Sequence, residues 1–252
     1  MMTKLSICII CKNEENKIAQ CLKSVSWADE IIIVDSGSTD RTIEVARRFT
    51  DKIYTEVDWQ GFGVQRRRAE EYANNNWIFA IDCDEIVSEA LKIEIIDKVN
   101  NAKDDDVFCV NRLTNFCGEF IYHSGWYPDK IARIYNKKKY RYNSSLVHEA
   151  LDCNKAKKTH LQGELFHYQY DDLYQYINKR NRYASLSAED KNRKGKKGSL
   201  TKATLSAIFA FIRHYFLRAG FLDGRLGFTI AVIQMQYTFN KYLFTCFHKS
   251  TQ

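Results

Sequence analysis

Short apolar runs rich in β-branched residues alternate with helical stretches through the first 100 residues. The pattern predicts strands at Leu5–Ile10, Glu30–Val34, Lys52–Thr55 and Trp77–Ile81, and helices from Asn13 to Val25 and at Arg41–Phe49, Gln65–Tyr72 and Ser88–Asn100. Strands that alternate with helices in this rhythm favour an α/β fold with a doubly wound, mostly parallel sheet. We therefore expect a nucleotide-binding type of half-domain over residues 1–100.

The pattern changes after residue 100. Shorter strands are predicted at Val107–Val110, Phe116–Tyr122 and Lys130–Tyr135, and helices at Asp171–Leu186 and through Leu200–Phe247. The chain of 252 residues is long enough for one large domain with an appendage, and it holds a single proline and no Gly/Ser linker. We expect one domain at residues 1–190, with halves at 1–100 and 101–190, and a basic, amphipathic helical tail at 191–252.

Charge is unevenly distributed. Residues 1–190 carry 27 Lys and Arg against 30 Asp and Glu, whereas residues 191–252 carry 11 Lys and Arg and a single acid, Asp223. The body is therefore close to neutral and the tail has a net charge of +10, which predicts an anionic partner for the tail.

The eight cysteines do not form a recognisable metal or disulfide framework. Only Cys8 and Cys11 stand three residues apart, no second such pair exists, and no signal-peptide pattern opens the sequence. This usage fits free thiols in a reducing cytoplasm.

Polar clusters follow three of the predicted parallel strands, at Cys11–Glu14, Asp35–Ser38 and Asp82–Asp84. Ligands of open parallel sheets bind beyond the carboxyl ends of the strands, so these clusters are expected to share one site. Two carboxylates one residue apart suit a hard divalent cation held against a diphosphate. No G-x-G-x-x-G follows the first strand and no phosphate-binding G-x-x-x-x-G-K-[ST] occurs, which disfavours a dinucleotide fold and a P-loop.

Leu5–Glu14, Val34–Asp40 and Ile81–Glu85 together resemble the signatures of family-2 inverting glycosyltransferases. Gln65-Arg66, Trp126–Asp129 and Val147–Glu149 take part in the resemblance, which covers roughly residues 3–190 and is strongest to bacterial lipopolysaccharide inner-core glucosyltransferases. It implies a GT-A fold, a nucleotide-diphosphate sugar donor, usually UDP-linked, and Mg²⁺ or Mn²⁺. One departure is Arg67, where the family often has Asn.

The resemblance also implies roles for individual residues. Asp84 is expected to hold the cation, with Asp82 on the cation or the ribose, and Glu149 to be the general base that takes the acceptor's proton; Asp129 is the reserve candidate. His167 is either a further metal or diphosphate contact or a packed core residue, and Trp126 and Tyr127 are either a platform for the acceptor sugar or core aromatics. The predicted donor-binding residues are Cys11, Asn13, Glu14, Asp35, Ser36, Gln65, Arg66, Asp82, Cys83 and Asp84.

The sequence of the tail predicts where in the cell the protein acts. A basic cluster at Lys191–Lys197 precedes two apolar segments, Ala203–Leu217 and Leu226–Asn240, which are shorter than the roughly 20 apolar residues of a spanning helix. They fit interfacial helices on anionic lipid, so we expect a peripheral protein on the cytoplasmic face of a bacterial inner membrane with a lipid-linked, anionic saccharide as acceptor. A helical cap on the domain or a dimer contact is the alternative.

Other functions remain possible from the residues alone. A nucleic-acid-binding protein would use Arg66–Arg68, Lys137–Lys139 and the tail, but no nucleic-acid motif accompanies them, and nucleic acid is not expected as a partner. A nucleotidylyltransferase would need a glycine-rich loop after the first strand, where the chain has Cys11–Glu14. A non-catalytic relative that binds nucleotide without turnover fits the same motifs. The resemblance suggests glucose as the sugar, and the oligomeric state is not predicted.

Overall fold

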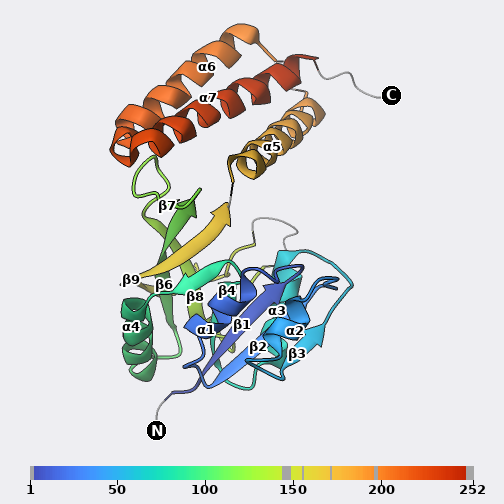
Figure 1. The fold of residues 1–252 in the computed structure, drawn as a ribbon, viewed down its shortest axis with the longest axis vertical. Coiled ribbons are helices and arrows are strands. Elements are labelled where there is room, and N and C mark those ends of the chain that lie inside the picture. The colour runs from blue at the N-terminus through green and yellow to red at the C-terminus, as the bar shows by residue number, and fades with distance from the viewer. Residues whose placement is uncertain (1–2, 144–148, 155, 171, 196–197, 248–252) are drawn as a thin grey trace. The chain divides into compact units, whose positions relative to one another are not determined.

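The computed structural model describes residues 3–143, 149–154, 156–170, 172–195 and 198–247 (Figure 1). The chain divides into two compact units: Met1–Arg112 with Asp129–His167, and Leu113–Pro128 with Tyr168–Gln252. The sequence prediction divides the chain at residue 190 instead. The structural division comes earlier because Leu113–Pro128 and the helix that begins at Leu173 pack with the C-terminal helices.

The first unit is an α/β sandwich. Its elements are β1 (Leu5–Cys11), α1 (Ile18–Ser24), β2 (Glu30–Asp35), α2 (Thr42–Ala46), β3 (Ile53–Thr55), α3 (Phe62–Tyr72), β4 (Trp77–Asp82), β5 (Glu85–Val87), α4 (Glu89–Asn100), β8 (Asp129–Asn136) and most of β6 (Asp106–Phe116) and β9 (Lys157–Tyr170).

The strands form one mixed sheet in the order β3-β2-β1-β4-β8-β6-β9-β5, with the short β7 (Glu119–Phe120) beside β6. The first four strands are parallel, and the pairs β4–β8, β6–β8 and β5–β9 are antiparallel. In register, Cys11 lies opposite Asp35, and Ile10 lies opposite Asp82. The carboxyl ends of β1, β2 and β4 therefore coincide, and the polar residues that follow them meet at one edge.

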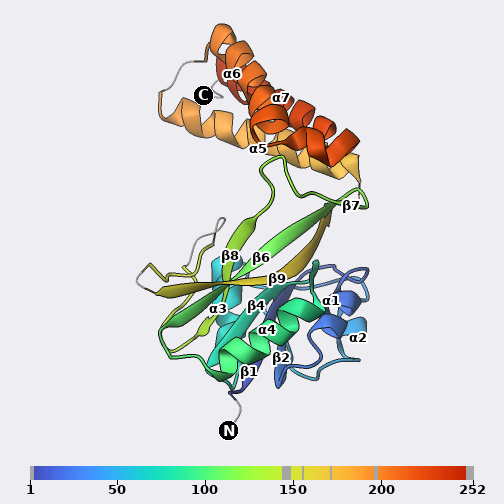
Figure 2. The same cartoon turned by 90° about the vertical axis from the view of Figure 1, so that its left-hand side faces the viewer.

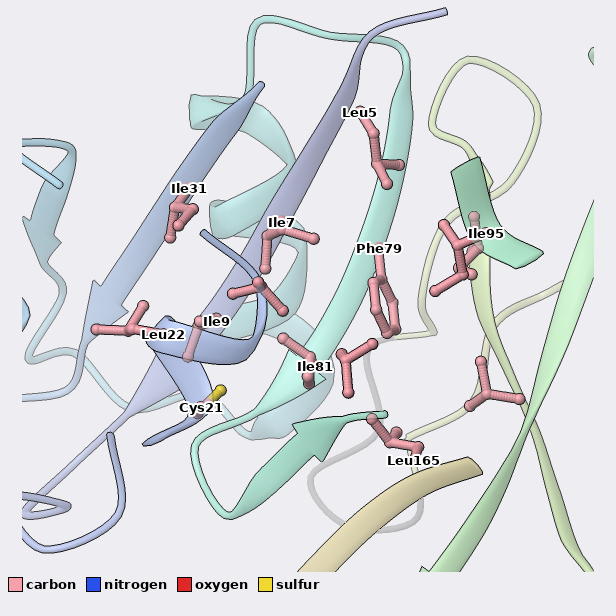
Figure 3. Packing of buried hydrophobic residues seen from close by; sticks show 14 of the residues in the cluster. Leu5, Ile7, Ile9, Cys21, Leu22, Ile31, Phe79, Ile81, Ile95 and Leu165 are labelled. Carbon is pink, nitrogen blue, oxygen red and sulfur yellow. The ribbon is translucent and has the colours of Figure 1, made fainter. Parts of the chain in front are cut away.

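Alternation along the parallel strands builds a core on each face of the sheet. Ile7 and Ile9 face α1 and α4, as Figure 3 shows, whereas Cys8 faces α3. The helices thus cover both faces (Figure 2). Because the central strands are buried on both sides, they read as continuous apolar runs in the sequence.

The predicted α/β class is confirmed, and each element predicted for residues 1–100 is found, although α1 begins at Ile18 and not at Asn13, and β5 was not predicted. The antiparallel half was predicted less well. The long strand β9 was missed, and so was the isolated bridge between Tyr142 and Leu151.

Glu30 anchors the start of β2 from a buried position. Its carboxylate accepts hydrogen bonds from Ser6 Oγ (2.5 Å), Asn74 N (2.8 Å) and Asn74 Nδ2 (2.6 Å), and it forms an ion pair with Lys52. Burial alone would raise the pKa of Glu30, but these partners outweigh it and lower the pKa to about 2. The ionised form is thus favoured by folding, and its stabilisation is present above the ordinary pKa and lost as pH falls towards 2.

We expect Glu30→Gln to lower the free energy of unfolding at neutral pH by about 3 kcal/mol, the linkage value of that lowered pKa. Urea denaturation of both proteins at pH 7 and pH 3 measures the difference, which should be more than halved at pH 3. Glu44→Gln, at an exposed carboxylate paired with Arg48, is the control. A difference that does not change with pH would contradict the assignment.

The second unit is mostly helical. It contains β7, α5 (Leu173–Arg193), α6 (Leu200–Ile212), the π-helical turn η1 (Arg213–Leu217), the 3₁₀ turn η2 (Gly220–Asp223) and α7 (Gly224–Phe247). The helix α7 packs against both α5 and α6 (Figure 2). The helical stretch predicted for residues 200–247 is therefore two helices, which η1 and η2 separate.

In the described part of the chain, no single helix is long and apolar enough to cross a bilayer. Leu200–Leu217 and Gly220–Phe247 meet that criterion only as a pair, with a bend of 72° between them.

Candidate active site

The loops after β1 and β2 are joined by hydrogen bonds. Asn13, in the left-handed region with φ of 57°, accepts from Thr39 N through Oδ1 (2.8 Å), and its own N–H donates to Ser38 Oγ (2.9 Å). The N–H of Glu14 donates to Thr42 Oγ1 at 2.7 Å. The two loops therefore form one connected rim.

Asp35 shapes the second of these loops. Its buried carboxylate accepts from the backbone N–H groups of Gly37 and Ser38 and from Ser38 Oγ. Cys11 Sγ lies 3.6 Å from Asp35 Oδ1. Asp35 thus fixes a tight loop whose backbone lines the edge of the sheet.

Helix α3 supplies two more of the predicted residues. Gln65 is fully buried and donates through Nε2 to Ser36 Oγ (2.7 Å) and to the carbonyl of Glu56 (2.9 Å). Arg66, one residue on, donates from Nη2 to Asp82 Oδ1 (2.6 Å), and its Nε lies 3.4 Å from Glu149 Oε1. The predicted base is thereby linked to the end of β4 through one guanidinium.

Asp82 is the centre of an ion-pair network whose other members, Arg66, Arg133 and Glu85, are buried. Arg66 binds one of its oxygens, and Arg133 Nη2 binds the other at 2.6 Å and reaches Glu85 Oε1 at 3.0 Å. Burial would raise the pKa of the Asp82 carboxyl, but Arg133 and Arg66 outweigh it and hold that pKa well below its usual range. Burial raises the pKa of Glu85, an effect that Arg133 opposes and Asp82 reinforces.

Asp84 lies beside a histidine. His167 in β9 pairs in register with Glu85, and its Nε2 is 3.3 Å from Asp84 Oδ2. The Asp84 side chain keeps about a quarter of its surface exposed (23%), whereas that of His167 is nearly buried. A partly exposed carboxylate and a nearly buried imidazole therefore lie next to each other.

This geometry separates the roles of the two aspartates. With a guanidinium on each carboxylate oxygen, Asp82 has positive charge where a cation would bind, so Asp84 is the better ligand of the two. No group of three His, Cys, Asp or Glu side chains in the described ranges is arranged to enclose a metal. Asp84 and His167 nevertheless fit a cation that takes its remaining ligands from a bound diphosphate, as Mg²⁺ sites often do.

The remaining residues singled out from the sequence either make other contacts or lie outside the residues that the structure describes. Cys83 is buried and its Sγ lies 3.4 Å from the carbonyl oxygen of Ile10, so its side chain belongs to the core. Asp129 is bound by Arg112 at 2.7 Å. Trp126 packs in the core of the second unit, with its ring 5.4 Å from that of Phe116. Val147 and His148 lie outside the described residues.

Sequence reasoning missed Arg133 and Glu85. Their partners are distant in the chain: 51 residues separate Arg133 from Asp82 and 48 separate it from Glu85. One signal was available, because Arg133 interrupts the apolar strand Lys130–Tyr135 at a position where a lone charge requires a buried partner.

All eight cysteines are free thiols, and the six in the first unit are all buried. Burial, with the nearby Glu85, Asp82 and Asp84, raises the pKa of Cys21 well above its usual range, so this thiol stays protonated. The thiols near the site are therefore packing groups and not nucleophiles.

Comparison with known proteins identifies the family. Residues 6–162 match glycosyl transferase family 2. An uncharacterized glycosyltransferase of Rickettsia typhi is 32% identical over 92% of this chain and 83% of its own length. The lipopolysaccharide core biosynthesis glycosyltransferase LpsC of Rhizobium meliloti is 30% identical over 93% of this chain and 89% of its own length.

Among solved structures, glucosyl-3-phosphoglycerate synthase from Mycobacterium tuberculosis, in complex with Mn²⁺ and uridine-diphosphate-glucose, is 21% identical over 45% of this chain and 44% of that chain, with a TM-score of 0.37. The family match covers more than half of the chain, and the named relative matches nearly all of it. The chain therefore belongs to glycosyl transferase family 2.

Proposed function

We propose that the protein is an inverting glycosyltransferase that moves a hexose, glucose by preference, from a UDP-linked donor to a lipopolysaccharide or lipooligosaccharide core. The observation that carries the proposal is the pairing of Asp84 with His167, next to the arginine-bound Asp82, at the carboxyl edge of the parallel strands. Family membership and the similarity to LpsC support the reaction class and the acceptor class.

The loops after β1 and β2 are proposed to bind the nucleoside. Asp35 and Asn13 hold these loops in place through their own hydrogen bonds, so the exposed backbone and Ser38 present preformed contacts. Gln65 fixes Ser36 in turn, through the hydrogen bond from its Nε2 to Ser36 Oγ. A preformed site binds its ligand with a smaller loss of conformational entropy.

Arg66 is proposed to bind a phosphate of the donor. Its guanidinium is buried, and within the described part of the chain Nη1 has no hydrogen-bond partner. A buried N–H without a partner is costly, and a phosphate oxygen satisfies it with a charge-assisted hydrogen bond.

A divalent cation fits Asp84 and His167 in this proposal. When bound, it would neutralise charge on the leaving diphosphate. The imidazole favours Mn²⁺ over Mg²⁺, since Mg²⁺ prefers oxygen ligands. Asp82 acts differently: it holds Arg66 and Arg133 in place beside the cation site.

Glu149 is proposed as the general base. Its carboxylate lies 3.4 Å from Arg66 Nε, and a carboxylate is a group that can accept the proton of the acceptor hydroxyl. One fifth of the Glu149 side chain is exposed, so an acceptor has access to it.

The C-terminal helices are proposed to rest on the cytoplasmic face of the inner membrane. Large apolar side chains on α6 and in the turns that follow it are exposed, among them Leu205, Phe209, Phe216 and Leu217. Exposed apolar surface with lysine and arginine around it suits the interface of an anionic bilayer, where a lipid-linked acceptor is found.

Calorimetric titration with UDP, with GDP as the control, tests the donor site. We expect UDP to bind at least tenfold more tightly with Mn²⁺ present, and Asp84→Asn to lose this gain, because it removes a cation ligand. Asp97→Asn, at an exposed carboxylate on α4, should keep it. Absence of binding to either nucleotide would contradict the transferase proposal, and a full Mn²⁺ effect in Asp84→Asn would contradict the role of Asp84.

A further inference from the structure

Helix α6 presents its small residues to its neighbour and its large ones to solvent. Ala203, Ala207, Ala210 and His214 recur at helical spacing and are buried in the α6–α7 hairpin. The opposite stripe is 40% to 63% exposed and consists of Leu205, Ile208, Phe209, Ile212 and Phe216. A surface helix of a globular protein has the reverse arrangement, so this stripe requires an apolar partner.

A groove runs between α6 and α7 next to this stripe. It has a volume of about 400 Å³, within the usual range of ligand sites. Leu205, Phe209 and Ala210 form its apolar wall, and Arg213 and Lys241 add one cation from each side of the hairpin. The groove therefore combines a surface for a hydrocarbon chain with a site for an anion.

The two cations have no anionic partner in the described residues. Arg213 Nη2 lies 3.4 Å from His214 Nε2, and Lys241 lies 5.3 Å from the ring of Tyr242. The sole acid of residues 191–252 is Asp223. Its carboxylate is engaged by the backbone N–H groups of Tyr122 and His123 and by Ser124 Oγ, and is not available to either cation.

The end of the α6–α7 hairpin that contains η1 and η2 is rich in aromatic residues. The rings of Phe211, Tyr215, Phe216, Phe221 and Phe228 lie 5.1 to 6.4 Å apart where they pair, and three of these side chains are about half exposed. Aromatic side chains gather at the level of lipid headgroups. The apolar stripe, the aromatic end and the unpaired cations thus all match one kind of partner.

We propose that the α6–α7 groove is a binding site for one anionic glycerophospholipid of the membrane. An acyl chain lies against Leu205, Phe209 and Ala210, and the phosphate lies between Arg213 and Lys241. The site is separate from the donor site, and the inference rests on the proposed membrane attachment but not on the transfer reaction. We therefore expect the protein to prefer anionic to zwitterionic lipid more strongly than its net charge alone would explain.

Co-sedimentation with phosphatidylglycerol vesicles and with phosphatidylcholine vesicles tests the site. The variant Arg213→Gln/Lys241→Gln should bind phosphatidylglycerol vesicles about 10- to 30-fold more weakly, the expected effect of two cations at a lipid surface. The control Arg182→Gln/Lys98→Gln removes the same charge from α5 and α4. An equal loss in the control would overturn the proposal, because it would show attraction by net charge alone.

Calorimetry with monomeric dihexanoyl phosphatidylglycerol distinguishes a specific lipid-binding site from general attraction to a membrane surface. We expect saturable binding of one molecule, lost in Arg213→Gln/Lys241→Gln and not seen with dihexanoyl phosphatidylcholine or inorganic phosphate. Equal binding of inorganic phosphate, or no saturable binding, would overturn the proposal. UDP titration of the same samples shows whether each variant keeps its donor site, so failure here is distinguishable from failure of the transferase proposal.

Light scattering tests the competing occupant, a second copy of the chain. Leu205→Asp/Phe209→Asp should abolish vesicle binding and leave the molecular mass in solution unchanged. A dimer that dissociates in this variant, together with no vesicle binding by the native protein, would assign the groove to a protein contact and overturn the lipid site.

Discussion

Replacing Glu149 with glutamine should lower kcat/KM for sugar transfer by about 100- to 10,000-fold, the usual contribution of a positioned general base. Glutamine keeps the size of the side chain but cannot accept the proton of the acceptor hydroxyl. UDP affinity should stay within about twofold of the native value, because the variant retains Asp84, His167 and the loops after β1 and β2. Initial rates with a UDP-sugar and a core saccharide measure the first effect, and calorimetry measures the second.

Asp129→Asn is the matched control, since Asp129 is the other carboxylate that the sequence offers as a base. Asp129 is bound by Arg112 at 2.7 Å. We expect this variant to lose much less activity. A large loss in Asp129→Asn together with near-native rates in Glu149→Gln would transfer the role of base to Asp129.

The parallel half of the fold was readable from the sequence because its signals are local. Strands β1, β2 and β4 are buried on both faces and appear as short apolar runs, and the polar residues after them are adjacent in the sequence. The register Cys11–Asp35 and Ile10–Asp82 then brings those residues to one edge. The family resemblance added the roles of single residues, which periodicity alone does not provide.

The antiparallel half of the sheet was harder to predict because residues that are not apolar occupy buried positions in it. Strand β9 alternates buried and exposed residues, but His167 occupies one buried position and Gly163 another, so the run does not look apolar. Gly163 is needed because a Cβ there would lie 2.3 Å from the Leu91 backbone of α4. Such a requirement depends on a helix more than 70 residues earlier, and sequence alone does not show it.

The buried charges explain why the candidate site was only partly predicted. Asp82 and Asp84 look equivalent in the sequence, yet one is enclosed by Arg66 and Arg133 and the other faces His167. Their different roles come from long-range pairing and not from the triplet itself. The position of Arg133 within an apolar strand is the one local sign of this network.

Replacing Arg133 with methionine should lower the free energy of unfolding at neutral pH by about 3–5 kcal/mol, the cost of breaking a buried ion pair from one side. Methionine fills similar space but leaves Glu85, which is fully buried, with the N–H of Asp82 and with the more distant Arg112 at 3.6 Å as its cation. Asp82 loses one of its two ion-pair partners and retains the other, Arg66. Urea denaturation measures the loss, and Arg112→Met, at a side chain that is about a quarter exposed (26%), should lose less.

The pH dependence gives the sharper test. Without Arg133, burial should raise the pKa of Glu85 further, so the folded variant holds a proton that the unfolded chain releases. A raised carboxyl pKa in the folded state destabilises the protein as pH rises above the ordinary value, and the deficit of Arg133→Met should therefore grow between pH 5 and pH 8. Adding Glu85→Gln should remove that slope and recover part of the lost stability. A deficit that is constant across this range would show that Arg133 stabilises the fold by packing, and not by compensating Glu85.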